Sequence, residues 1–143
     1  MMARRLMVCL LAMSMVKPMF CDPEQDVTDV VSRLAGALSD NNPQLFMKTF
    51  DPAMPGYRKL EQDVAALAGQ NLIGCEIEVI GNSGTPSAPA ADLDWYMSLK
   101  SQQDENLIER RRTKVTIKIE KRGKKWVITS FSPMSIFAPM TAR

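Results

Sequence analysis

The sequence contains no histidine, only three cysteines and seven glycines, and aromatic residues make up just 6% of its 143 positions. Without histidine the chain cannot form a Ser-His-Asp or Cys-His catalytic system, a histidine-ligated metal site, or the usual general base near neutral pH. It also lacks a Gly-rich phosphate loop, a metal-binding cysteine spacing and a nucleophile elbow. These absences exclude several large enzyme classes, and we expect no metal or organic cofactor.

The residues that are present suffice for one folded domain. Apolar residues make up 45% of the chain and charged residues 24%. A chain of this length removes roughly two thirds of its unfolded surface from water, so it needs no disulfide framework. The composition also disfavours disorder, collagen and coiled coils. We expect a single domain over residues 22–139, followed by a short tail over residues 140–143.

The first 21 residues differ in kind from the rest. Two arginines precede the apolar run 6–16, and Lys17-Pro18 ends it, which is the order of a secretory signal peptide. The run is shorter than the roughly 20 residues that a membrane span needs. We therefore predict a signal peptide over residues 1–21, export to the periplasm or the cell exterior, and no transmembrane span after processing.

The cleavage position stays open because the leader has no A-x-A sequence. A cut after Cys21 would leave only Cys75, which we interpret as a small buried hydrophobe. An earlier cut would allow a disulfide between these two cysteines. A lipoprotein acylated at Cys21 is disfavoured by the bulky Phe20 before it, and an uncleaved anchor is a further alternative.

Charge is distributed unequally along the expected mature chain. Residues 22–99 carry 4 basic and 12 acidic side chains, whereas residues 100–143 carry 11 basic and 4 acidic ones. The overall balance after the leader is 15 basic against 16 acidic residues. The mature chain is therefore nearly neutral but strongly lopsided.

Apolar residues at helical spacing predict three helices, over residues 22–40, 42–51 and 57–69. The first two begin with a capping side chain followed by proline, Asp22-Pro23 and Asn42-Pro43. Pro52 ends the second helix, and Gly69 ends the third.

From residue 73 onward the apolar period changes to two. This alternation predicts strands over residues 73–79, 93–99, 112–119 and 126–131, with the first strand ending at residues 81–84 and a loop-like stretch over residues 85–90 after it. Helices followed by consecutive strands predict an α+β domain, with three helices packed on one face of a curved, mostly antiparallel four-stranded sheet. We expect the opposite face to be polar and mostly basic.

Three segments carry a resemblance to a known superfamily. They are Phe50-Asp-Pro-Ala-Met-Pro-Gly-Tyr57, Leu93-Asp-Trp-Tyr96 and Gly123-Lys-Lys-Trp-Val-Ile-Thr-Ser-Phe-Ser-Pro133. With the order of three helices and four strands, they resemble small exported bacterial members, of uncharacterised role, of the nuclear transport factor 2-like superfamily (NTF2-like or SnoaL-like proteins). The resemblance implies a cone-shaped fold and a homodimer that pairs through its sheets. Members range from enzymes to interaction modules.

In that fold the helices close one end of the sheet and leave a pocket in its hollow. The residues expected to face the hollow are apolar and would suit a lipid or another hydrophobic small molecule. They are Phe46, Phe50, Tyr57, Ile77, Trp95, Met97, Val115, Ile117 and Phe131. The alternative is that they simply fill the cone as core.

The resemblance also bears on catalysis. The family's isomerases use a tyrosine and two carboxyl groups in the hollow, and its dehydratases use a histidine-containing pair that this chain lacks. Asp51 and Asp63 could approach the mouth, while Asp94 falls on the polar face if Trp95 points inward. No set matches residue by residue, so a carboxylate-dependent isomerase or lyase acting on a hydrophobic substrate is the alternative hypothesis.

Nine cations gather over residues 110–125. They could form an anion-binding surface on one strand face, centred on Arg110, Arg112 and Lys114. The alternative is a solvated face that keeps the sheet soluble, with Glu76 and Glu78 as cross-strand partners.

Nucleic acid is a poor fit as a partner, because export removes the usual target and Tyr96 and Trp126 are too few for a stacking platform. We therefore predict an exported, non-catalytic binding or assembly domain that acts through its sheet face or its pocket. The expected partners are a second copy of the chain or a hydrophobic small molecule.

Overall fold

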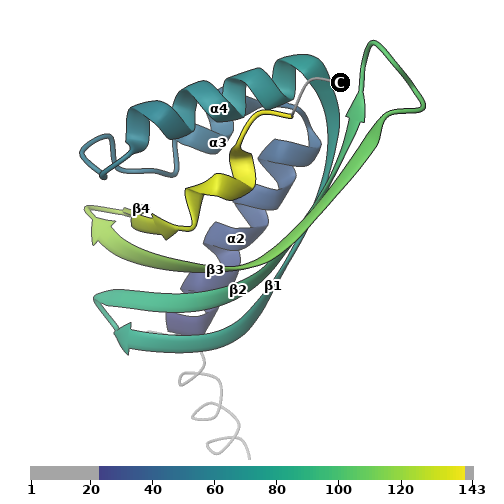
Figure 1. The fold of residues 1–143 in the computed structure, drawn as a ribbon. Coiled ribbons are helices and arrows are strands. Elements are labelled where there is room, and N and C mark those ends of the chain that lie inside the picture. Colours follow the sequence, from purple (N-terminus) through teal and green to yellow (C-terminus); the bar gives the residue numbers. More distant parts are fainter. Residues whose placement is uncertain (1–22, 141–143) are drawn as a thin grey trace, which may run out of the picture.

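The computed structural model describes residues 23–140 (Figure 1). The predicted leader, residues 1–21, lies outside the described residues, as does the predicted tail after residue 140. Within the described range, the helices lie on one face of a curved, unclosed four-stranded sheet. The predicted α+β class is confirmed. No helix of this part of the chain is long and apolar enough to cross a membrane.

The three predicted helices are present as α2 (Pro23–Ser39), α3 (Pro43–Met47) and α4 (Tyr57–Gln70). Asn42 caps α3, because its side-chain oxygen accepts a hydrogen bond from the backbone N–H of Leu45 at 3.0 Å. α3 is shorter than predicted. The residues after it leave the helix, and Phe50 instead forms a parallel bridge with Ile128.

The four strands are β1 (Asn71–Thr85), β2 (Ala88–Ser101), β3 (Ile108–Arg122) and β4 (Lys125–Ser132), followed by the short 3-10 helix η2 (Met134–Phe137). Each strand pairs antiparallel with the next, in the order β1-β2-β3-β4. Consecutive antiparallel pairing requires only short connections, which explains why the strands follow one another directly in the chain.

The predicted end of the first strand at residues 81–84 is wrong, and the loop predicted over residues 85–90 is reduced to a turn at Pro86 and Ser87. After a bulge between Val79 and Gly81, β1 continues to Thr85 and pairs with the start of β2. The Gly- and Ser-rich composition resembles a turn, but the neighbouring strand supplies the hydrogen bonds that these residues need. Gly84 has a φ of 82°, and a Cβ there would lie 2.6 Å from the carbonyl oxygen of Ala88, so this position requires glycine.

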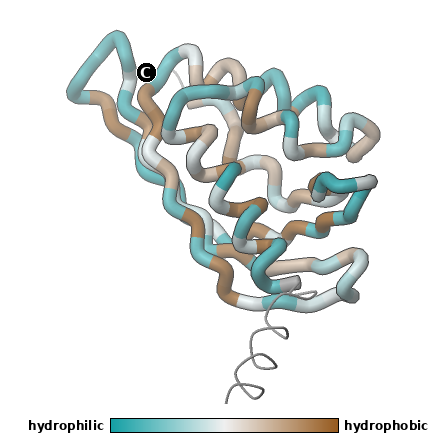
Figure 2. The backbone as a smooth tube through the Cα atoms, turned by 180° about the vertical axis from the view of Figure 1, so that it is seen from behind, coloured by the Kyte–Doolittle hydropathy of each residue, from teal (hydrophilic) through white to brown (hydrophobic). Residues whose placement is uncertain are grey.

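The predicted period of two along the strands is confirmed. Figure 2 shows apolar and polar residues alternating along them, and on β2 every second residue from Leu93 to Leu99 is 0% exposed. These side chains pack against the apolar faces of α2 and α4, in which Val27, Leu34 and Leu60 are at most 1% exposed. The core therefore lies between the concave side of the sheet and the helices.

Asn41 joins the helical layer to the start of β1. Its side-chain nitrogen donates to the carbonyl oxygens of Ala68 at 2.7 Å and Asn71 at 2.8 Å, and its side-chain oxygen accepts from the backbone N–H of Ile73 at 3.1 Å. Its φ is 54°, in the left-handed region that asparagine tolerates better than most residues. One residue between α2 and α3 thus fixes where α4 ends and β1 begins.

Candidate functional site

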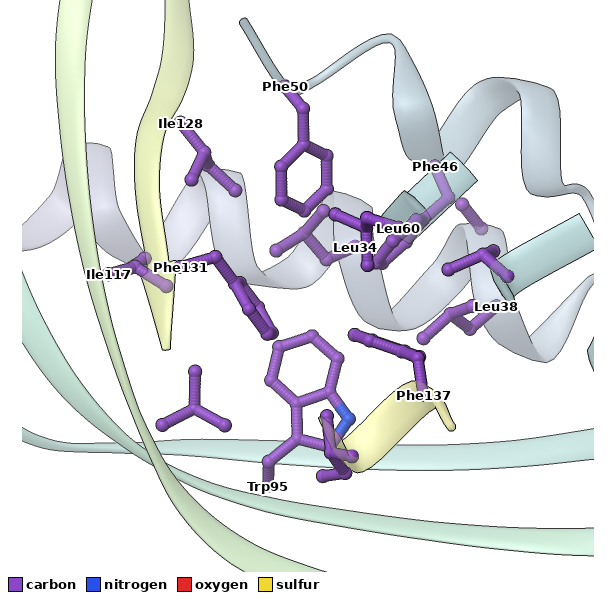
Figure 3. Close-up of a cluster of buried hydrophobic side chains, with 14 of the residues drawn as sticks. Leu34, Leu38, Phe46, Phe50, Leu60, Trp95, Ile117, Ile128, Phe131 and Phe137 are labelled. Carbon is purple, nitrogen blue, oxygen red and sulfur yellow. The ribbon is translucent and has the colours of Figure 1, made fainter. Parts of the chain in front are cut away.

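The hollow of the sheet is filled by aromatic side chains. Trp95 from β2 meets the rings of Phe131 and Phe137 edge to face, with centroids 5.3 and 5.6 Å apart. Phe46 and Phe50 extend the cluster toward α3, at a centroid distance of 5.1 Å from each other. Figure 3 shows these rings converging from the sheet, η2 and the helices. All five residues are at most 4% exposed.

Seven of the nine residues predicted to face the hollow lie in this buried core, each at most 4% exposed: Phe46, Phe50, Trp95, Met97, Val115, Ile117 and Phe131. Tyr57, at the start of α4, and Ile77, on the edge strand β1, are only half-buried.

The sequence reasoning missed Ile136 and Phe137, which are 5% and 1% exposed and close the hollow from η2. They lie in a short segment without periodicity, so no pattern in the sequence indicates their burial.

One polar atom in the hollow has no partner. The indole Nε1 of Trp95 is the single buried side-chain nitrogen or oxygen atom, among the residues that the structure describes, without a hydrogen bond. Figure 3 shows this nitrogen on the side of the ring that faces η2. A buried N–H without an acceptor costs free energy, about 1–3 kcal/mol in typical cases. The site is therefore apolar with a single unused donor.

The charged groups on the concave side are held in hydrogen bonds and ion pairs. Arg111 donates from Nε to the Glu109 carboxylate at 2.7 Å and from Nη1 to the carbonyl oxygen of Ile136 at 2.7 Å. Its side chain is only 13% exposed. Arg111 therefore holds η2 over the hollow, and the neighbouring carboxylate is engaged by a guanidinium group.

Of the two carboxylates considered as candidate acids, Asp63 forms an ion pair with Lys59 on α4 at 3.0 Å. Asp51 accepts a hydrogen bond from the backbone N–H of Ala53 at 2.9 Å and forms an ion pair with Arg122 at 2.8 Å. The Ala53 hydrogen bond, followed by the Arg122 contact, holds the pKa of Asp51 below its usual value. Asp51 is therefore ionised at neutral pH, which suits neither a general acid nor a strong base.

We expect Asp51 to titrate below the usual value of 3.8 in the folded protein. Because its folded pKa is depressed, the stability that it contributes is fully present above the unfolded pKa and is lost as the pH falls through the folded pKa. The measurement is an NMR titration of the Asp51 carboxyl carbon. Arg122→Gln should move the midpoint back toward 3.8, and an unchanged midpoint would contradict the assigned contact.

Asp94 lies on the outer, convex face, as predicted from the inward position of Trp95. Arg112 on β3 donates to both of its oxygens, at 3.1 and 2.7 Å. This bidentate contact lowers the pKa of Asp94 and raises that of Arg112. The neighbouring Asp92 accepts from Thr116 at 2.9 Å and lies 3.7 Å from the Lys114 ammonium group.

One prediction about the outer face is wrong. Glu76 and Glu78 are not opposite the basic residues, because β1 pairs with β2, and their cross-strand neighbours are Tyr96 and Asp94. In the rows from Asp92 to Tyr96 the charges form two columns, with carboxylates on β1 and β2 and cations on β3. Lys100 on β2 and Glu120 on β3 lie outside these rows. A shallow hollow of about 480 Å³ between the columns is lined by Glu76, Ile77, Glu78, Asp94, Tyr96 and Arg112.

The predicted cation set is divided by the fold. Arg110, Arg112 and Lys114 alternate along β3 onto the outer face, whereas Arg111 turns to the concave side. Arg112 and Lys114 are paired with carboxylates of β2, and Arg110 has no ion pair with a described residue. Two thirds of the candidate anion-binding set are thus neutralised by the protein itself.

Cys75 is a free thiol within the described residues. Burial, and then the nearby Glu76 carboxylate, raise the pKa of this thiol to about 12. Cys75 is therefore neutral at physiological pH and unsuited to nucleophilic chemistry. No cluster of three or more potential metal ligands occurs in the part of the chain that the structure covers.

No protein-family model matches the sequence, and no curated protein matches it. Solved structures do match the fold. A conserved protein from Planctomyces limnophilus has a TM-score of 0.68 at 8% identity, with 76% of this chain and 91% of that chain covered. An NTF2-like superfamily protein from Salmonella enterica serovar Typhimurium has a TM-score of 0.60 at 13% identity, with coverages of 77% and 89%. A putative scytalone dehydratase from Novosphingobium aromaticivorans has a TM-score of 0.64 at 8% identity, with coverages of 76% and 80%.

Proposed function

We propose that this chain, which has the nuclear transport factor 2-like fold, is a non-catalytic assembly domain that pairs with a second copy of itself through the outer face of its sheet. The observation that carries the proposal is the division of charge on that face, with acids on β1 and β2 and cations on β3. The same fold occurs in a putative dehydratase, so the fold alone decides neither for nor against catalysis.

The charge columns are complementary to themselves in one geometry. When two outer faces meet about a two-fold axis parallel to β2, the β1 strand of each copy lies over the β3 strand of the other. Glu76, Tyr96 and Arg112 lie in one row across β1, β2 and β3. In this geometry the carboxylate of Glu76 therefore faces Arg112 of the second copy. A two-fold axis perpendicular to the strands would instead stack β1 on β1 and oppose like charges.

The residues near the proposed axis are suited to this contact. Asp92 and Asp94 on β2 would face their own copies, but both are already paired with β3 cations, which reduces their repulsion. Tyr96 lies beside the 480 Å³ hollow, which offers space for an aromatic side chain of the other copy. A central tyrosine surrounded by polar groups is a common arrangement in protein interfaces.

The interior supports a non-catalytic role. Among the residues that the structure describes, Asn71 is the single buried polar residue, and the carboxylates at the edge of the hollow are bound by arginines. A reacting group in the hollow would have neither an acid nor a base within reach. The leader pattern of residues 1–21 places this assembly role outside the cytoplasm in our proposal.

The test is sedimentation velocity over a range of concentrations. We expect Glu76→Lys/Glu78→Lys to weaken the dimer at least tenfold, because both lysines would then face the partner's β3 cations. Arg112→Glu/Lys114→Glu should weaken it equally, and mixing the two variants should restore a heterodimer. Glu61→Lys on α4, in the helical layer, is the matched control. A monomer at every concentration, or a dimer unaffected by both double variants, would overturn the proposal.

A second candidate function is favoured by the unused N–H of Trp95. A hydrophobic molecule with one hydrogen-bond acceptor would replace Phe137 in the hollow and accept from this indole. Because η2 is a separate short segment, it can move without breaking the sheet. Titration with a neutral ketone, followed by the indole N–H signals in NMR, tests this candidate. A shift of the Trp95 signal that the Phe137→Ala variant strengthens supports it, and an unchanged signal in both proteins excludes ketone binding.

A further inference from the structure

A separate groove lies between α2, the end of α3 and the start of β4, and its volume is about 420 Å³. Its lining shares no residue with the outer face of the sheet. The proposed assembly role does not use it. Its size falls in the range of small-molecule sites, roughly 300–1,000 Å³.

The groove has an apolar wall. Leu45 from α3 is 48% exposed, although it is a large hydrophobic residue, and the half-buried ring of Trp126 from β4 lies on the same groove. Exposed apolar side chains gathered around a concave surface offer burial to an apolar partner, at roughly 25 cal/mol for each Å² removed from water.

Gly36 lines the groove from the exposed side of α2. A Cβ at this position would meet nothing within 4 Å, and the residue does not have a left-handed φ. Glycine inside a helix costs about 1 kcal/mol relative to alanine. Neither backbone conformation nor close packing requires glycine here, and the missing side chain leaves this side of the groove open.

The rim of the groove is positively charged. Arg33, Lys48 and Lys125 line it, with Asp40 as the one acid, which gives three positive charges against one negative. None of the three cations forms an ion pair within the described residues. Residues 22–99 contain only four cations, and two of those four, Arg33 and Lys48, meet at this groove. Half of the few cations of the acidic half thus lie at this groove.

We propose that this groove binds a small anionic amphiphile. The apolar body of the molecule lies over Gly36, between Leu45 and Trp126, and its carboxylate or phosphate head is held by Lys48, Lys125 and Arg33. An apolar wall beside unpaired cations favours a ligand that carries both properties. The volume of about 420 Å³ lies in the range of small-molecule sites, which favours a small molecule over an acidic protein.

The test compares decanoate with decanol, which share an apolar chain and differ in charge. Binding is followed through the indole N–H signal of Trp126, with Trp95 as the internal reference. We expect decanoate to shift the Trp126 signal and decanol to bind at least tenfold more weakly. Equal binding of the two molecules would overturn the proposal that the cations hold the head group.

Variants locate the binding to the groove. Lys48→Glu/Lys125→Glu should weaken decanoate binding at least tenfold, whereas Lys100→Glu/Lys118→Glu, the same charge change on the sheet, should leave it within twofold. Gly36→Met should project a side chain into the groove and abolish binding of both molecules, and Gly36→Ala should keep decanoate binding within a few-fold. Decanoate binding that survives both Lys48→Glu/Lys125→Glu and Gly36→Met in folded protein would overturn the proposal.

A vesicle experiment distinguishes a free small molecule from a membrane lipid that carries the same head group. Phosphatidylglycerol vesicles are mixed with the protein and sedimented, with neutral phosphatidylcholine vesicles as the control. We expect monomeric decanoate to bind while the protein stays in the supernatant with both vesicle types. Protein that sediments with phosphatidylglycerol and fails to bind decanoate would overturn the free small molecule as the ligand.

Discussion

Replacing Trp95 by alanine is expected to lower the free energy of unfolding by about 3–5 kcal/mol, the cost of removing a large aromatic side chain from a packed core. Trp95 is 0% exposed and lies at the centre of the aromatic cluster, in edge-to-face contact with Phe131 and Phe137. Its removal opens a cavity beside Phe131 and Phe137. Urea denaturation followed by far-UV circular dichroism measures the change.

The matched variant is Trp95→Phe, which keeps an aromatic ring and removes the unpartnered N–H. We expect it to cost less than half as much as Trp95→Ala, because the smaller cavity is partly offset by removal of a buried donor without an acceptor. Equal costs for the two variants would contradict the conclusion that ring packing dominates at this position. A cost below 1 kcal/mol for Trp95→Ala would show that the hollow is not filled in solution.

Asn41→Ala is expected to lower the free energy of unfolding by about 3–5 kcal/mol. The change removes three hydrogen bonds, to Ala68, Asn71 and Ile73, each contributing about 1 kcal/mol. It also places alanine at a φ of 54°, in the left-handed region that alanine tolerates less well than asparagine. Thermal and urea denaturation give the measurement.

Two further variants separate these contributions. Asn41→Gly removes the hydrogen bonds but accepts the left-handed backbone, so it should cost about 1 kcal/mol less than Asn41→Ala. Asn41→Asp keeps the acceptor for the Ile73 N–H and loses the two donations. An Asn41→Ala cost equal to that of an exposed surface substitution would contradict the joining role of Asn41 between α2 and β1.

Much of the architecture could be predicted from the sequence because periodicity reports burial directly. The spacing of Val27, Leu34 and Leu38 predicted α2, and the alternation around Trp95 predicted the inward face of β2. The same argument predicted that Asp94 lies on the outer face. In each of these segments, the local pattern and the tertiary environment agree.

The errors occur where a partner strand or a distant segment overrides the local pattern. Residues 81–85 and 88–90 have the composition of a loop, yet pairing between the ends of β1 and β2 makes them strand. Glu76 was assigned to β3 cations because its charge fits them, but strand order places β2 between them. The burial of Phe137 depends on η2 folding back over the sheet, and the sequence of η2 carries no period that would indicate it.

By itself the sequence determined the fold class, the helix positions, the inward faces of the strands and the absence of histidine chemistry, because these depend on composition and on the spacing of neighbouring residues. Only the tertiary structure decided that the hollow is filled, that the outer charges form two columns, and that Arg33, Lys48 and Lys125 share one groove with Trp126. The physical reason is that long-range contacts join residues whose separation in the chain carries no periodic signal.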